Sequence, residues 1–143
     1  MKDNSKQRLL EVFRKVNNLS ESLTIEDKNI IVGEFVDYVN DFIELNRNLP
    51  EIELIYDIEK AREMKSFGGY SPSDFSIIIV AANRNLADVL RTLAHELVHH
   101  KQNIEGRLKE NSGDTGSDEE NEANSLAGVI LRNFGRKNPV IYE

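Results

Sequence analysis

The sequence predicts an α+β domain, in which a small twisted sheet packs on two helices of the C-terminal half and further helices lie at the N-terminus. Hydrophobic residues recur with helical spacing in four segments, 9–16, 25–45, 86–100 and 118–134. Short runs rich in β-branched and apolar residues, typical of strands, occupy 52–56 and 75–81. The apolar content of 39% in 143 residues suits one compact domain, 1–143.

The N-terminal part, residues 1–48, is expected to be helical. Thr24 is a typical N-cap for its second helix, which is predicted to continue to about Leu45. Pro50 interrupts the chain, because proline cannot continue a regular helix or a sheet ladder. We therefore expect a core of residues 50–135 to follow.

Within this core, the pattern predicts a short helical turn at 58–65 and a turn or strand around the consecutive glycines of 66–70. The apolar segment 75–81 is expected to be a strand that leads into a long helix. Gly135 is expected to end the last helix.

Residues 95–99, His-Glu-Leu-Val-His, form an HExxH motif inside the predicted helix of 86–100. Residues four apart lie on one face of a helix, so His95 and His99 could bind the same metal ion. Glu96 lies beside them, where it could take a proton from a metal-bound water. The motif indicates zinc-dependent hydrolysis of peptide bonds.

A single histidine on a helix is more often a partly exposed polar residue, or a core residue with one satisfied nitrogen. A pair at this spacing with Glu96 between them favours metal binding. All three histidines of the chain fall in this run. His100 lies about 100° around the helix from His99, so we expect it to support the site or to lie on the surface.

A zinc site of this kind needs a third protein ligand. The chain has no cysteine and no histidine outside the run, so the ligand is expected to be Asp or Glu. An acidic stretch at 118–122 follows Ser117 and begins the last predicted helix. Such a stretch is by itself more typical of a solvated helix start, where the helix dipole favours negative charge.

The segment Glu120-Asn121-Glu122-Ala123-Asn124 resembles the second metal-binding element of the gluzincin metallopeptidases. In that family the ligand Glu is followed by a small residue three positions later and by Asp or Asn four positions later. The short chain is similar to the single-domain minigluzincins. It also resembles metallopeptidases of tailed phages and those that act beside phage repressors and in toxin–antitoxin systems, over roughly residues 50–135.

The resemblance implies a zincin-like fold with Zn²⁺ held by His95, His99 and Glu120. It further implies that Asn124 orients one of the ligand histidines. Ala123 and Ala127 would let the two helices approach closely. Many gluzincins have Asp in place of Asn124, and an amide accepts a hydrogen bond without adding charge.

Larger gluzincins also supply a Tyr or His that stabilises the tetrahedral intermediate. Tyr70 and Tyr142 are the candidates here. The predicted function is that of a zinc metalloendopeptidase in which Glu96 acts as general base. One alternative is a catalytically weak or inactive zinc-stabilised module that binds a peptide or protein. Another is a metal-dependent hydrolase of a different small substrate.

The expected partner is a peptide or protein substrate, bound in extended form along the strand of 75–83. In gluzincins the strand before the HExxH helix has a free edge to which substrate adds; an ordinary core strand is compatible with this role. The segment 105–118 is expected to be an exposed loop beside the site. Its Asp114, together with Asp118 and Glu119, could instead bind Ca²⁺, although the spacing matches no recognised calcium loop.

The net charge of −7 argues against nucleic acid as a partner, since phosphate contacts require a basic patch. The polar start of the chain resembles neither a signal peptide nor a membrane anchor, and no apolar run is long enough to span a bilayer. With no cysteine present, a cytoplasmic location is expected, in the host cell if a phage encodes the chain. The tail 138–143 is expected to pack on the domain or, alternatively, to lie along the site as a lid.

Overall fold

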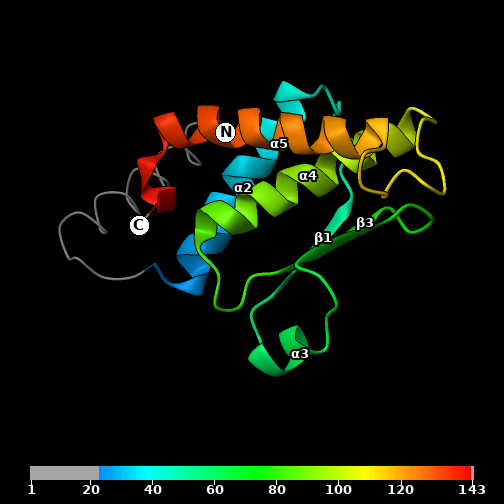
Figure 1. Ribbon diagram of the computed structural model, residues 1–143. Coiled ribbons are helices and arrows are strands. Elements are labelled where there is room, and N and C mark those ends of the chain that lie inside the picture. The colour runs from blue at the N-terminus through cyan, green and yellow to red at the C-terminus, as the bar shows by residue number, and fades with distance from the viewer. Residues whose placement is uncertain (1–22, 143) are drawn as a thin grey trace.

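The computed structural model describes residues 23–142 and has the predicted α+β class (Figure 1). The helix predicted at 9–16 lies outside the described residues. The elements follow the order α2 (Ile25–Phe42), β1 (Glu51–Ile55), α3 (Ile58–Arg62), β2 (Gly68–Ser71), β3 (Ser76–Val80), α4 (Leu86–Ile104), α5 (Asp118–Lys137) and the 3-10 helix η1 (Pro139–Tyr142).

The start of α2 was predicted correctly, and its end was placed too late. The Thr24 hydroxyl accepts a hydrogen bond from the backbone N–H of Asp27, and the Asp27 carboxylate accepts one from the backbone N–H of Thr24. This reciprocal cap fixes the first turn. The helix ends at Phe42 rather than near Leu45, because Glu44 takes a left-handed backbone conformation with φ of 55°.

The sheet has three strands in the order β1-β3-β2, with β1 parallel and β2 antiparallel to β3. Ile77 of β3 is opposite Ile52 on one side and Tyr70 on the other. The prediction that the strand of 75–83 has a free edge is therefore wrong. Strands β2 and β3 form a hairpin. Strand β3 is therefore hydrogen-bonded to β1 on one side and to β2 on the other, and β2 forms an edge of the sheet.

Helix α4 occupies the centre of the described structure. It packs against α5, β2, β3, α2 and η1, whereas α5 makes its main contacts with α4 rather than with the sheet. Figure 1 shows α5 running back along α4 in the opposite direction, with the sheet on the other side of α4. The expectation that the sheet packs on both helices therefore needs correction, because α4 separates α5 from it.

Large apolar side chains from α2, α4, α5, β3 and η1 form the core. Phe35 of α2 meets Phe134 of α5 edge to face, with ring centroids 5.0 Å apart, and both rings are buried. Leu93 and Leu97 of α4 are fully buried in the same core. Ala123 and Ala127 of α5 are also buried, which fits the expectation that small residues let α5 approach α4. This packing holds the two site helices together.

The C-terminal tail packs on the domain, at the end of α5 opposite to Glu120. Val140 and Ile141 are each 1% exposed, and η1 contacts both α4 and α5. The tail forms a 3-10 helix. Gly135 lies inside α5 rather than at its end, with the Tyr142 ring against it. Among the described residues, no helix combines the length and apolar character needed to cross a membrane.

Candidate metal centre

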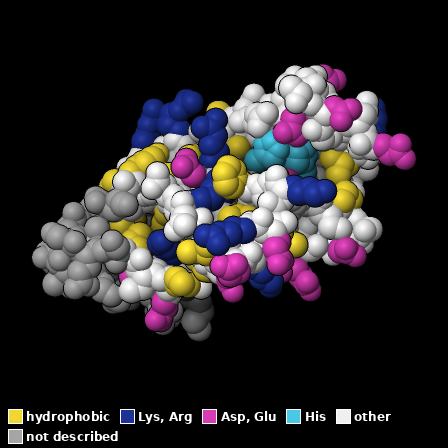
Figure 2. Space-filling view, turned by 60° about the horizontal axis from the view of Figure 1, so that its bottom comes forward, with side chains coloured by type: hydrophobic (Ala, Val, Ile, Leu, Met, Phe, Trp, Pro, Cys, Tyr) yellow, Lys and Arg dark blue, Asp and Glu magenta, His cyan; other side chains and the backbone are white. Residues whose placement is uncertain are grey.

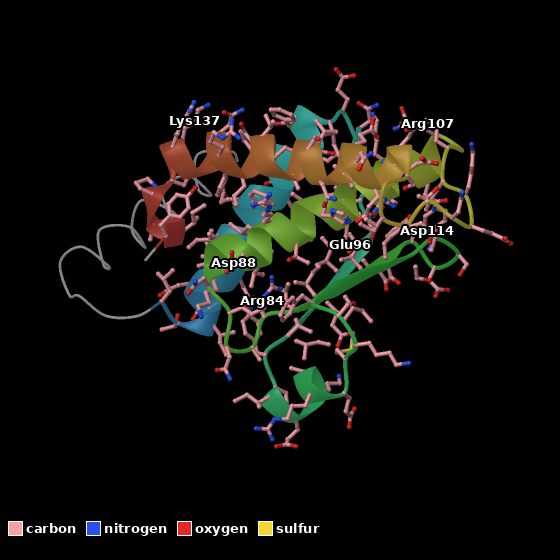
Figure 3. All side chains as sticks on the ribbon, viewed as in Figure 1. Arg84, Asp88, Glu96, Arg107, Asp114 and Lys137 are labelled. Carbon is pink, nitrogen blue, oxygen red and sulfur yellow. The ribbon has the colours of Figure 1, made fainter. Side chains whose placement is uncertain are left out.

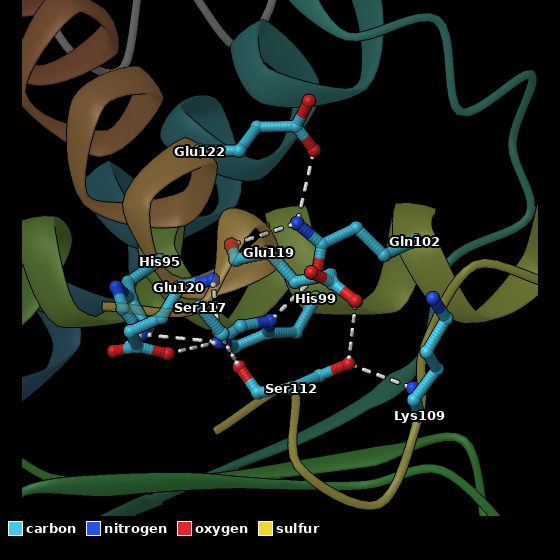
Figure 4. A network of polar contacts seen from close by, with 9 residues as sticks. All are labelled: His95, His99, Gln102, Lys109, Ser112, Ser117, Glu119, Glu120 and Glu122. Carbon is cyan, nitrogen blue, oxygen red and sulfur yellow. Dashed lines mark hydrogen bonds and ion pairs between the residues drawn. The ribbon is translucent and has the colours of Figure 1, made fainter. Parts of the chain in front are cut away.

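The two histidines of the HExxH motif lie one turn apart on the face of α4 that meets α5. Glu120 lies in the first turn of α5, whose position is set by Ser117. The Ser117 hydroxyl accepts a hydrogen bond from the backbone N–H of Glu120 at 3.1 Å, which caps the helix. The local sequence therefore brings one carboxylate to the two imidazoles (Figure 4).

The structure brings His95, His99 and Glu120 together as one group that could hold a metal ion. Nε2 of His95 lies 3.0 Å from Oε1 of Glu120, and Nε2 of His99 lies 3.0 Å from Oε2. The two Nε2 atoms are 3.2 Å apart. Metal ligands in proteins are commonly His, Cys, Asp or Glu. Within residues 23–142, this is the one group of at least three such residues whose ligand atoms all lie within 4.8 Å of one another.

The group is partly open to solvent. The side chains of His95 and Glu120 are 18% and 21% exposed, whereas that of His99 is 9% exposed. Figure 2 shows histidine side chains reaching the surface of the molecule, with hydrophobic side chains beside them. A further ligand from solvent could thus reach an ion held by the three residues.

Burial shapes the electrostatics of this site. It lowers the pKa of His95, although the charge of Glu120 and a hydrogen bond with the Asn124 side chain act in the opposite direction. The Asn124 side chain therefore lies beside His95, the histidine of the motif that is nearer to the start of α4. Burial also raises the pKa of Glu96 to about 7; the His99 imidazole opposes this shift and the Glu120 carboxylate adds to it.

Glu96 lies on the side of α4 that faces the sheet (Figure 3). It is 8% exposed, next to the edge strand β2. A Cβ atom built on Gly68 would lie 3.5 Å from Oε2 of Glu96 and only 2.6 Å from Cγ2 of Thr92. The backbone of β2 therefore approaches α4 closely at the position of the expected general base.

This close approach yields a stability prediction. Gly68→Ala is expected to lower the free energy of unfolding by about 1–3 kcal/mol, because the added methyl group would overlap Thr92. Gly69→Ala is the matched control, since a Cβ there meets nothing within 4 Å. Urea unfolding of both variants measures the difference. Equal stability of the two would contradict the close packing of β2 on α4.

Sequence reasoning missed Gln102, which is fully buried beside His99. Its Oε1 lies 2.7 Å from Nδ1 of His99, and its Nε2 donates to the backbone carbonyl of Glu119 and to Oε1 of Glu122, both at 2.9 Å. The spacing in the sequence could have identified Gln102, because a residue three positions after His99 lies on the same face of the helix.

His100 and Tyr70 do not belong to the metal group. His100 is 2% exposed; its Nε2 lies 2.7 Å from the carbonyl oxygen of Asn48, and its Nδ1 lies 2.7 Å from the Tyr70 hydroxyl. The Tyr70 hydroxyl also accepts a hydrogen bond from Asn103. These contacts tie β2 and the segment before β1 to α4. Tyr142 lies against Gly135, at the end of α5 far from Glu120.

The alternative calcium ligands are not brought together. Asp114, Asp118 and Glu119 form no such group within the described part of the chain. The Glu119 carboxylate instead accepts a hydrogen bond from the Ser112 hydroxyl at 2.9 Å. Its role in the structure is to hold the loop before α5.

No protein-family model, curated protein or solved structure matches this chain.

Proposed function

We propose that the chain is a zinc-dependent metallopeptidase with a gluzincin-like site, in which His95, His99 and Glu120 are the zinc ligands. The observation that supports this most is the convergence of two imidazoles from α4 and one carboxylate from α5 within 4.8 Å. Two His and one Glu are a ligand set of zinc peptidases, which keep a further position open for water or substrate.

The spacing of the ligand atoms is compatible with zinc. Tetrahedral ligands at Zn–N and Zn–O distances of about 2.0–2.2 Å lie roughly 3.3–3.6 Å apart. The two Nε2 atoms lie 3.2 Å apart, and each lies 3.0 Å from a different oxygen of Glu120, distances a little shorter than that range. A zinc ion bound there would lower the pKa of a water molecule and polarise the scissile carbonyl group.

In this proposal Glu96 is the general base. It accepts a proton from the attacking water and delivers it to the leaving amine. Its carboxylate is held on the same helix as the two histidine ligands, in a buried position that limits competition from solvent. Asn124 supports the reaction indirectly by holding His95 through a hydrogen bond.

The proposed substrate is an extended peptide or protein segment. The sheet has an antiparallel edge strand, β2, that packs on α4 beside Glu96, and we assign substrate addition to this edge rather than to β3. Main-chain hydrogen bonds to β2 would align the peptide with the three ligand residues. A sheet edge next to α4, with α5 on the other side of that helix, is the basis for proposing a zincin-like arrangement.

A second candidate is a zinc-stabilised module that binds a peptide without cleaving it. The positions of the two tyrosines favour this alternative. The Tyr70 hydroxyl is bonded to His100 and Asn103, and Tyr142 lies against Gly135 at the far end of α5. Tyr142 therefore lies away from the metal group, and the Tyr70 hydroxyl is already engaged in two hydrogen bonds. Cleavage of a peptide library by the zinc-loaded chain separates the two candidates.

Metal removal gives the direct test of the zinc site. The purified chain is expected to bind about one equivalent of Zn²⁺. At a free zinc concentration one hundred times the Kd, binding adds about 2.7 kcal/mol of stability, which corresponds to a rise in Tm of roughly 10 °C. Elemental analysis and thermal unfolding with and without a chelator measure both. A Tm insensitive to zinc and chelator, with no bound metal, would refute the proposal.

A further inference from the structure

The amide group of Gln102 has only one orientation that satisfies its neighbours. One side of the amide faces the backbone carbonyl oxygen of Glu119 and Oε1 of Glu122, each at 2.9 Å. A carbonyl oxygen can only accept a hydrogen bond, so the NH₂ group must lie on this side. The oxygen of the amide therefore faces His99.

This orientation selects the tautomer of His99. Oε1 of Gln102 lies 2.7 Å from Nδ1 of His99 and can only accept, so Nδ1 must carry a proton. In the neutral imidazole, Nε2 is then left with its lone pair. That atom is the one that faces His95 and Glu120, at 3.2 Å and 3.0 Å. Nε2 of His99 is thus prepared to bind a cation.

Arg107, in the loop that follows α4, also contacts the residues that hold His99. Arg107 donates to Oε1 of Glu122 at 2.7 Å, and its own backbone N–H donates to the backbone carbonyl of Gln102 at 2.8 Å. Glu122 therefore lies between the Arg107 guanidinium and the Gln102 amide. The contacts run from Arg107 through Glu122 and Gln102 to His99 and join both site helices. Figure 4 shows the part of this series from Glu122 to His99.

We propose that Gln102 is a positioning residue, which holds His99 with Nε2 directed at the metal, and that Glu122 acts through it by fixing the direction of its amide. This inference rests on the metal site of the proposed function. It assigns a role to the third residue after the HExxH motif, on the same helical face as the two ligands. Residues that support metal ligands typically change metal affinity by about 10–100-fold when they are removed.

The test measures zinc affinity of the full chain by competition with a chromophoric chelator, so it needs no peptide cleavage. Gln102→Met keeps the length of the side chain but removes its acceptor and donors. We expect it to weaken zinc binding by about 10–100-fold. In ¹H–¹⁵N spectra of the zinc-loaded wild type, the Nδ1 proton of His99 is expected to exchange slowly with water. In the variant this signal should be lost.

Glu122→Ala provides the second variant. It leaves Gln102 in place and removes one of the two acceptors that fix the direction of its amide. We expect zinc affinity to fall in the same direction as in Gln102→Met, and by less, because the Glu119 carbonyl remains. If Gln102→Met does not fold, this variant and the wild-type spectrum decide: wild-type affinity in Glu122→Ala with a rapidly exchanging Nδ1 proton of His99 in the wild type overturns the inference.

Ser112→Ala is the structural control. Ser112 is 1% exposed; its hydroxyl accepts a hydrogen bond from the backbone N–H of Lys109 and donates one to the Glu119 carboxylate in the first turn of α5. Zinc affinity should be unchanged in this variant. An equal loss of affinity in Ser112→Ala and Gln102→Met would overturn the positioning role, as would wild-type affinity in Gln102→Met.

The outcome also separates this inference from the proposed peptidase activity. A chain that binds zinc, loses affinity in Gln102→Met and cleaves no peptide would refute the peptidase and leave the role of Gln102 standing. A wild-type chain that binds no zinc would overturn both.

Discussion

Glu96→Gln is expected to lower kcat/KM for peptide cleavage by at least about 100-fold, while the zinc content stays at the wild-type value. The amide has nearly the shape of the carboxylate but cannot accept the proton of the attacking water. Because Glu96 lies on the side of α4 that faces the sheet and is not a member of the group of three ligands, we expect the substitution to leave these ligands in place. Steady-state kinetics and elemental analysis of the same preparation give both quantities.

Asp88→Asn serves as the control for this prediction, since it makes the same change of carboxylate to amide on an exposed part of α4. Its kinetics should match those of the wild type. Peptide cleavage by Glu96→Gln at the wild-type rate would eliminate Glu96 as the base. Loss of zinc from that variant would mean that Glu96 contributes to the metal site itself.

Glu120→Ala is expected to reduce zinc affinity by more than about 100-fold, beyond the 10–100-fold typical of residues that only support ligands. It removes the one carboxylate that faces both histidines, at 3.0 Å from each Nε2. His95→Ala should have an effect of similar size. Competition with a chelator measures the change, and thermal unfolding of the metal-free proteins shows whether the fold is retained.

The neighbouring Glu119 provides the matched control for Glu120→Ala. Its side chain points to Ser112, and its backbone carbonyl, which Gln102 uses, is unaffected by substitution. Glu119→Ala should therefore keep tight zinc binding. If Glu119→Ala loses zinc and Glu120→Ala keeps it, the assignment of the third ligand is wrong.

The sequence predicted the parts of the fold that depend on local pattern. Thr24 was identified as a cap because its side chain bonds within its own turn, and the HExxH helix because its apolar residues repeat at helical spacing. His95 and His99 are separated by one turn, so their meeting follows from helix geometry alone. Glu120 lies on another helix. Its selection among neighbouring carboxylates depended on the resemblance carried by Ala123 and Asn124.

Features that depend on distant pairing were not predictable in the same way. Strand β2 is at the edge of the sheet because Gly68–Ser71 pairs only with β3. The order of strands in a sheet cannot be deduced from the residues of the individual strands. Gln102 was missed because a glutamine near the end of a helix is normally solvated. Its burial depends on α5 covering that turn. The hydrogen bond between the Tyr70 hydroxyl and His100 joins residues 30 positions apart, so it could not be predicted from the sequence either.

The two outer strands of the sheet differ in their capacity for self-association. Strand β1 exposes Glu51 and Glu53, so a second copy approaching that edge would place like charges opposite one another. Strand β2 begins with Gly68 and Gly69 and carries no charged residue. The charges of β1 therefore oppose aggregation through that edge of the sheet. The edge formed by β2, next to Glu96, can still accept an additional strand.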